Sequence, residues 1–118
     1  MKIDVLGTKY TIRRVDYGKD KNIEHNDWVG YCGEITKEIV ILNLRTSPAW
    51  EKETDEVITK KEKETLRHEL IHAFLNESGL SWSSLTPSAW AKNEEMVDWL
   101  AIQFPKIMAA FTKCDCLD

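Results

Sequence analysis

Two histidines and a glutamate within residues 66–74 are the side chains best spaced to do chemistry, because they form the pattern H-E-x-x-H. On a helix, residues four apart share one face, with Cβ atoms roughly 5–6 Å apart. His68 and His72 would therefore point two imidazoles at a single place, the arrangement that two nitrogen ligands of one Zn²⁺ ion need.

Glu69 directly follows the first histidine, so it can reach a water on the metal without binding the metal itself. A metal ion lowers the pKa of its bound water towards about 7, and a nearby carboxylate can then accept the proton as the water attacks a carbonyl. The motif predicts a zinc-dependent hydrolase with Glu69 as its general base.

A pattern with two free positions also arises by chance, and a helical histidine is often an ordinary surface or core side chain. Two observations favour the metal site. The chain has only three histidines, and two of them belong to the motif. The surrounding apolar residues recur at helical spacing and predict one buried stripe, made of Leu66, Leu70, Ala73 and Phe74 and widened by Ile71 and Leu75.

A catalytic zinc site needs a third protein ligand and one open position for water. A second predicted helix offers three carboxylates, Glu94, Glu95 and Asp98. Glu94 and Asp98 are one turn apart and share a face, whereas Glu95 points about 100° away. A carboxylate beside a ligand histidine commonly accepts its other ring N–H. The alternative for the two glutamates is a favourable charge in the first turn of a helix.

The two motifs together resemble the gluzincin pattern, in which H-E-x-x-H is followed on a later helix by E-x-x-x-D. Here the pattern is His68 to His72 and then Glu94 to Asp98. The resemblance implies that Glu94 is the third zinc ligand and that Asp98 orients a ligand histidine. Ala101 lies on the same face as Glu94, and its small side chain permits close helix approach.

The small size and the strands before the motif helix resemble ImmA/IrrE-like and minigluzincin-type metallopeptidases of bacteria and phages. The SprT-like zinc peptidases are a less favoured alternative, because the third ligand expected there is histidine. The resemblance implies peptide-bond hydrolysis, with a peptide or protein as substrate. We expect that substrate to pair as an added strand on an exposed sheet edge beside the motif helix.

The chain departs from the larger gluzincins in one respect. They add a histidine or tyrosine after the second motif to stabilise the oxyanion, and here neither residue follows His72. Tyr10, Tyr17, Tyr31 or His25 would have to substitute from upstream. This departure favours an alternative interpretation, in which the chain is a regulatory or protein-binding module that retains zinc for structure. A third alternative is an interaction protein without a metal.

Composition limits the class of protein. The length of 118 residues predicts one domain, and 42% hydrophobic with 31% charged residues is typical of a globular protein. The net charge of −4 gives no general attraction to nucleic acid or to anionic membranes. No apolar run approaches the roughly 20 residues of a membrane span, and the first residues are too charged for a signal peptide.

Cysteine usage predicts a cytoplasmic protein, because three cysteines without the spacing of a disulfide framework suit a reducing compartment. Cys114 and Cys116 are too close in sequence for a typical zinc-binding pair, which has about two to four intervening residues. The sequence leaves the oligomeric state open.

We expect an α+β, zincin-like fold in which a small antiparallel or mixed sheet packs on the motif helix and on a second ligand-bearing helix. One hairpin is predicted at residues 2–6 and 9–15 with its turn at Gly7-Thr8, and another at about 29–32 and 38–43. Residues 16–28, including His25, are expected to form a loop.

The motif helix is predicted to begin between residues 54 and 59 and to end near Gly79, a common residue just after a helix. Residues 80–89 then form a loop rich in hydroxyl groups. The second helix starts within residues 88–91 and runs to about residue 104, where Pro105 bends or ends it.

Overall fold

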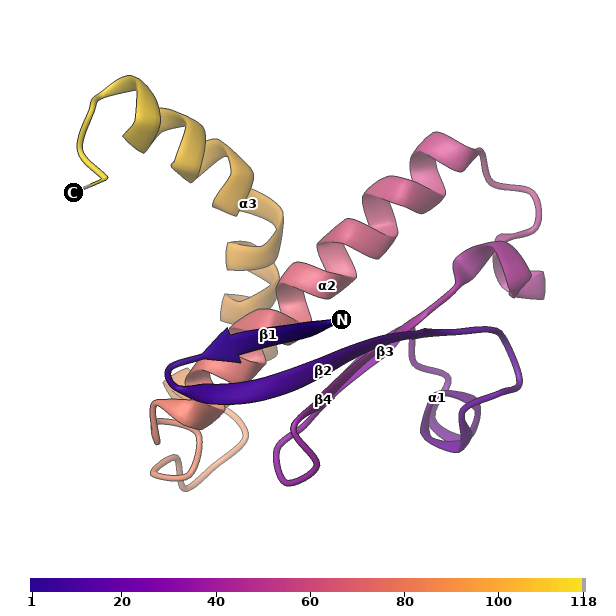
Figure 1. The fold of residues 1–118 in the computed structure, drawn as a ribbon, viewed down its shortest axis with the longest axis horizontal. Helices are drawn as coiled ribbons and strands as arrows, with labels where there is room; N and C mark the ends of the chain where they lie inside the picture. Colours follow the sequence, from indigo (N-terminus) through magenta and orange to yellow (C-terminus); the bar gives the residue numbers. More distant parts are fainter. Residues whose placement is uncertain (118) are drawn as a thin grey trace.

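Four strands form one mixed sheet in the order β1–β2–β4–β3 (Figure 1), as seen in the computed structural model, which describes residues 1–117. β1 (Lys2–Val5) and β2 (Thr8–Val15) make the first hairpin. Its turn is Leu6-Gly7, one residue earlier than expected, and both residues have positive φ, 51° and 90°. Such angles match the right-handed twist of a two-residue hairpin.

The second hairpin, β3 (Gly30–Gly33) and β4 (Glu38–Leu42), is antiparallel as predicted. β4 lies beside β2 in parallel, with Ile39 opposite Ile12. β1 and β3 are therefore the two sheet edges. The expected α+β class with a small mixed sheet is confirmed.

The core lies on both faces of β4, whose continuous apolar run correctly predicted a strand covered on two sides. On one face, Ile39 and Ile41 pack with Ala73 of α2 (Asp55–Glu77). On the other face, Val40 and Leu42 pack in a second cluster that includes Ile23. Figure 1 shows α2 and the short helix that carries Ile23 on opposite sides of the strands.

That short helix is α1 (Lys21–Asn26), so the prediction of a loop through residues 16–28 was wrong. The Asp20 side chain caps it by accepting from the backbone N–H groups of Asn22 and Ile23 at 3.0 and 3.1 Å. Ile23 is buried, whereas His25 lies exposed in the last turn. One apolar anchor and one cap thus fix a helix too short to show periodicity.

α2 begins after Thr54, whose side chain caps the helix, and ends two residues before Gly79 with its φ of +83°. The single apolar stripe predicted for this helix is instead split between two partners. Leu66, Leu70 and Ala73 pack towards the sheet, while Ile71 and Leu75 pack with Val97 of α3 (Glu94–Lys113). Phe74, expected in the stripe, lies between the two contacts and is 44% exposed.

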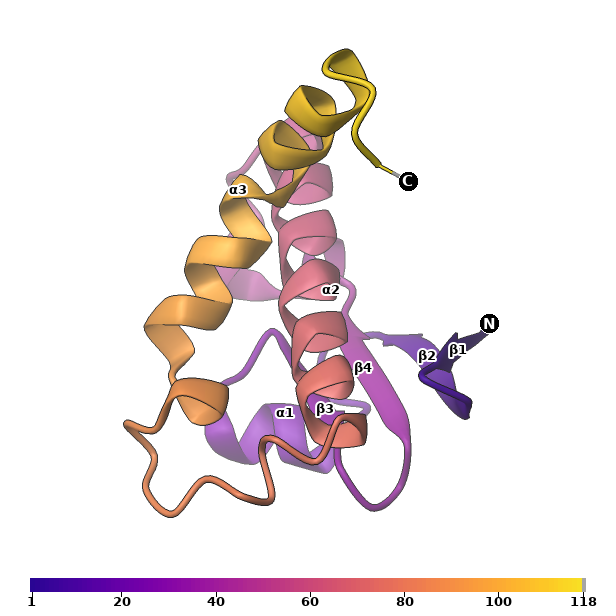
Figure 2. The same cartoon turned by 90° about the vertical axis from the view of Figure 1, so that its left-hand side faces the viewer.

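The first half of α3 packs against the second half of α2 (Figure 2), and α3 continues through Pro105 rather than ending near it. Figure 1 shows a bend partway along the helix, as expected for an internal proline. Three 3₁₀ turns complete the regular structure: η1 (Leu44–Thr46), η2 (Pro48–Trp50) and η3 (Trp90–Lys92). None of the helices within residues 1–117 combines the length and apolar character needed to cross a membrane.

Candidate metal centre

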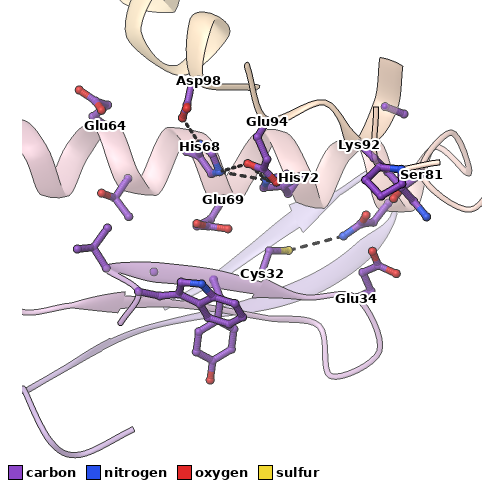
Figure 3. A pocket seen from close by; sticks show the side chains of 18 of the residues that line it. Cys32, Glu34, Glu64, His68, Glu69, His72, Ser81, Lys92, Glu94 and Asp98 are labelled. Carbon is purple, nitrogen blue, oxygen red and sulfur yellow. Dashed lines mark hydrogen bonds and ion pairs between the residues drawn. The ribbon is translucent and has the colours of Figure 1, made fainter. Parts of the chain in front are cut away.

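Two helices carry the predicted site residues. His68, Glu69 and His72 lie in the second half of α2, and Glu94 and Asp98 lie in the first turns of α3. The Asn93 side chain caps α3 by accepting from the Met96 N–H at 2.9 Å, so Glu94 is the first residue of the helix. Figure 3 shows Glu94 and Asp98 directed at the histidines.

The structure brings three potential ligands to one point. The Nε2 atoms of His68 and His72 are 3.1 Å apart. The Glu94 carboxylate lies 3.1 Å from His68 Nε2 and 3.2 Å from His72 Nε2. Ligand atoms around a tetrahedral zinc with bonds near 2.0–2.1 Å are about 3.3–3.4 Å apart. Two imidazole nitrogens and one carboxylate therefore fit such an ion, with a fourth position left over.

Asp98 completes the arrangement from one turn further along α3. Its Oδ1 lies 2.8 Å from Nδ1 of His68. A carboxylate there accepts the Nδ1–H, which leaves the lone pair on Nε2 facing Glu94 and His72. Glu95, the adjacent acidic residue, is exposed and belongs to none of these pairs.

The second histidine is held in the form that binds a metal. Burial lowers the pKa of His72, and the charge of His68 lowers it further, although Glu94 opposes both. A neutral imidazole keeps a free lone pair, which a metal ligand requires. His72 is thus suited to coordinate near neutral pH.

Glu69 is the acidic residue of the motif that stays outside the ligand cluster. It is 7% exposed, and within residues 1–117 its carboxylate has no hydrogen bond or ion pair to another side chain. Burial raises its pKa to about 7, with a smaller contribution from Glu94 and Asp98 that His68 opposes. A carboxyl group with such a pKa can accept and release a proton near neutral pH.

A cleft of about 850 Å³ adjoins the cluster. Its walls are α2, the start of α3, the loop between these helices, and edge strand β3. The Leu42 N–H donates to the Val29 carbonyl at 2.9 Å. Since antiparallel pairs alternate, the backbone N–H and C=O groups of Gly30 and Cys32 point away from β4. Glu69 thus faces a cleft with a free strand edge along one wall (Figure 3).

Gly30 lets that strand lie close to α2. A Cβ atom at this position would lie 2.7 Å from Cγ2 of Thr65, which is closer than real Cβ contacts allow. This role of Gly30 was not predicted from the sequence, although a glycine inside a strand is a known sign of close backbone approach. Three further cleft residues outside the two motifs were also not predicted: Cys32, Glu34 and Lys92.

Cys32 lies in the cleft but is unsuited to binding the metal. Burial raises the pKa of its thiol to about 12, and Glu69 adds to the effect. A metal-binding cysteine must instead lose its proton. Cys114 and Cys116 are exposed and join no metal-binding cluster among the described residues.

The upstream tyrosines and histidine that could stabilise an oxyanion do not present their polar groups to the cleft. The Tyr10 hydroxyl donates to Glu77 at 2.7 Å, and the Tyr31 hydroxyl donates to Asp20 at 3.0 Å. Neither Tyr17 nor His25 lines the cleft. Lys61 and Lys92 supply the positive side chains of its wall.

Comparison of the chain with protein-family models, curated proteins and solved structures finds no match. The likeness to gluzincins therefore depends on the two motifs and their spacing. Any assignment of function depends on the chemistry of the cleft.

Proposed function

We propose that the chain is a zinc-dependent peptidase of gluzincin type, with His68, His72 and Glu94 as the metal ligands. The convergence of two imidazole nitrogens and one carboxylate within 3.2 Å of one another carries this proposal. The protein would then be a small, single-domain member of the zincin fold class that acts in the cytoplasm. When bound, Zn²⁺ acts as a Lewis acid and lowers the pKa of a coordinated water towards about 7.

The residues of the chain supply the remaining chemistry. Glu69 accepts the proton of the attacking water and delivers it to the leaving amine, which its pKa of about 7 suits. Asp98 holds His68 in the tautomer that leaves Nε2 free to coordinate. The substrate pairs as an extended strand with the outward backbone groups of Gly30 and Cys32.

A regulatory or protein-binding module with a structural zinc is the second candidate. It is favoured by one observation, that none of the four upstream tyrosine and histidine candidates presents its polar group to the cleft. The unpaired carboxylate of Glu69 supports the peptidase instead, since a structural zinc site has no use for a buried acid beside it.

Digestion of a random peptide library by zinc-loaded protein separates the two candidates. We expect the native chain to cut peptides and Glu69→Gln to keep its zinc but lose at least about a hundredfold in rate, because a general base contributes that much. Glu53→Gln, which removes an exposed carboxylate outside the cleft, is the matched control and should cut normally. Bound zinc without any cleavage by the native chain would favour the regulatory module.

A further inference from the structure

Glu34 is a carboxylate without a partner at one end of the cleft. It is the first turn residue after β3, and it lines the cleft together with Gly30 and Cys32, whose face of the strand is turned to α2. It is half-buried and lines the cleft, and Figure 3 shows its carboxylate directed into the space between β3 and α2. Within residues 1–117 it makes no hydrogen bond or ion pair through its side chain.

Two lysines of this region are already paired with other carboxylates. The Lys37 ammonium contacts the Glu77 carboxylate and lies 5.6 Å from the centre of the Tyr10 ring. Lys61, in the cleft wall, pairs with Glu64 at 2.8 Å. Lys92, the other lysine of the cleft wall, makes no ion pair with Glu34 within residues 1–117, so the negative charge of Glu34 is available to a ligand in the cleft.

The cleft as a whole favours a positive ligand. Six carboxylates line it, against two lysines: Asp27, Glu34, Glu64, Glu69, Glu94 and Asp98, with Lys61 and Lys92. Even with a divalent cation on the ligand cluster, acidic groups exceed positive charges by two. A concave site lined mostly by one sign of charge attracts ligands of the opposite sign.

We propose that Glu34 selects substrates with a lysine or arginine close to the scissile bond, an inference that rests on the peptidase function proposed above. A strand paired with the edge of β3 has side chains on the α2 face opposite Gly30 and Cys32, at cross-strand Cβ distances of about 4.5–5.5 Å, and its next side chain on that face reaches the end of β3, where Glu34 lies. Glu34, the first turn residue after β3, lies two residues beyond Cys32, a span of up to about 7 Å. The selected side chain is therefore about two residues from the position opposite Cys32.

Peptide capture tests this specificity without requiring hydrolysis. Zinc-loaded Glu69→Gln protein is immobilised, short peptides of random sequence are passed over it, and bound peptides are sequenced by mass spectrometry. We expect lysine and arginine to be enriched about tenfold or more at a single position, since a charged hydrogen bond contributes at least that factor. Adding Glu34→Gln should abolish the enrichment, and adding Glu34→Lys should replace it with aspartate and glutamate. Adding Glu53→Gln should leave it unchanged.

Three outcomes would overturn the role of Glu34: basic enrichment that survives Glu34→Gln, no basic enrichment, or no captured peptide. Acidic enrichment that disappears with Lys92→Gln would assign the selection to Lys92 instead, and would equally overturn it. Selective capture by Glu69→Gln together with a native chain that cuts nothing would support Glu34 and contradict only the peptidase function.

Discussion

Arg67 of α2 donates through Nε to the backbone carbonyl of Ala101 in α3, at 2.6 Å. In an uninterrupted helix this carbonyl would accept from the N–H of residue 105, which here is a proline with no N–H to give. The bond therefore satisfies an acceptor that Pro105 leaves open. It also ties α3 to α2 in the turn after Asp98, next to the histidine that Asp98 contacts.

Removing this tie should loosen the cluster. We expect Arg67→Ala to lower the free energy of unfolding by about 1–3 kcal/mol, the cost of a charged hydrogen bond, and to weaken zinc binding as Glu94 and Asp98 move away. Arg67→Lys should recover part of both. Arg13→Ala, which breaks an exposed ion pair with Glu38, is the control and should leave zinc affinity unchanged. Full zinc affinity in Arg67→Ala would show that α3 is positioned without this bond.

The adjacent glutamates should differ sharply in zinc binding. Glu94 contacts both histidines, whereas Glu95 is exposed on another face of α3. Competitive zinc titration should therefore find Glu94→Ala severely impaired and Glu95→Ala close to native. Asp98→Asn should lose about 10–100-fold in affinity, as is typical when the partner of a ligand histidine is changed. A larger loss in Glu95→Ala would mean that α3 is rotated relative to α2.

The close approach of β3 to α2 can be tested by changing the size of the side chains at the contact. Gly30→Ala places a Cβ against Thr65 and should cost about 1–3 kcal/mol, as overpacking does. Thr65→Ser removes the methyl group at 2.7 Å but keeps the hydroxyl that bonds to Lys61, so the double mutant should recover part of the loss. Urea unfolding of the two single mutants and the double mutant measures the coupling. Strictly additive effects would show that Gly30 and Thr65 do not meet.

Glu77 should make stability depend on acid pH. Hydrogen bonds from Lys37 and Tyr10 lower the pKa of its carboxyl from 4.5 to about 2. A group whose pKa is lower in the folded state stabilises above its unfolded pKa, and this contribution is lost as the pH falls. We expect native protein to be more stable than Glu77→Gln at neutral pH, with the difference shrinking between pH 4.5 and pH 2. Urea midpoints over that range would contradict the assignment if the difference stayed constant.

The spacing of residues along the sequence correctly predicted which candidate site residues share a helix face. His68 and His72 lie one turn apart on a helix, a relationship that the sequence contains directly. The spacing of Glu94 and Asp98 likewise put both on one face of α3, but the turn from the loop into that helix depends on the Asn93 cap. The two helices are brought together by tertiary contacts, among them the packing of Val97 with Leu75 and the bond from Arg67 to Ala101, which have no short-range signal.

The features that were not predicted from the sequence depend on contacts between distant segments of the chain. α1 depends on burying Ile23 against β4, so residues 16–28 alone look like a loop. The parallel pairing of β2 with β4 joins segments separated by α1 and β3. Glu34 gains its place in the cleft only because β3 is an edge strand held close to α2 through Gly30. Periodicity cannot report such relationships, since each needs the sheet order to be known.

Zinc content is the decisive measurement for the proposed metal centre. Protein purified without an affinity tag is measured by elemental analysis beside Glu69→Gln and His72→Ala, with thermal unfolding on the same samples. We expect about one zinc per chain in the native protein and in Glu69→Gln. We expect little zinc and a much lower melting temperature in His72→Ala, since metal that joins two helices adds its binding energy to folding. A native chain without zinc, or a His72→Ala chain with unchanged zinc, would contradict the proposed metal centre.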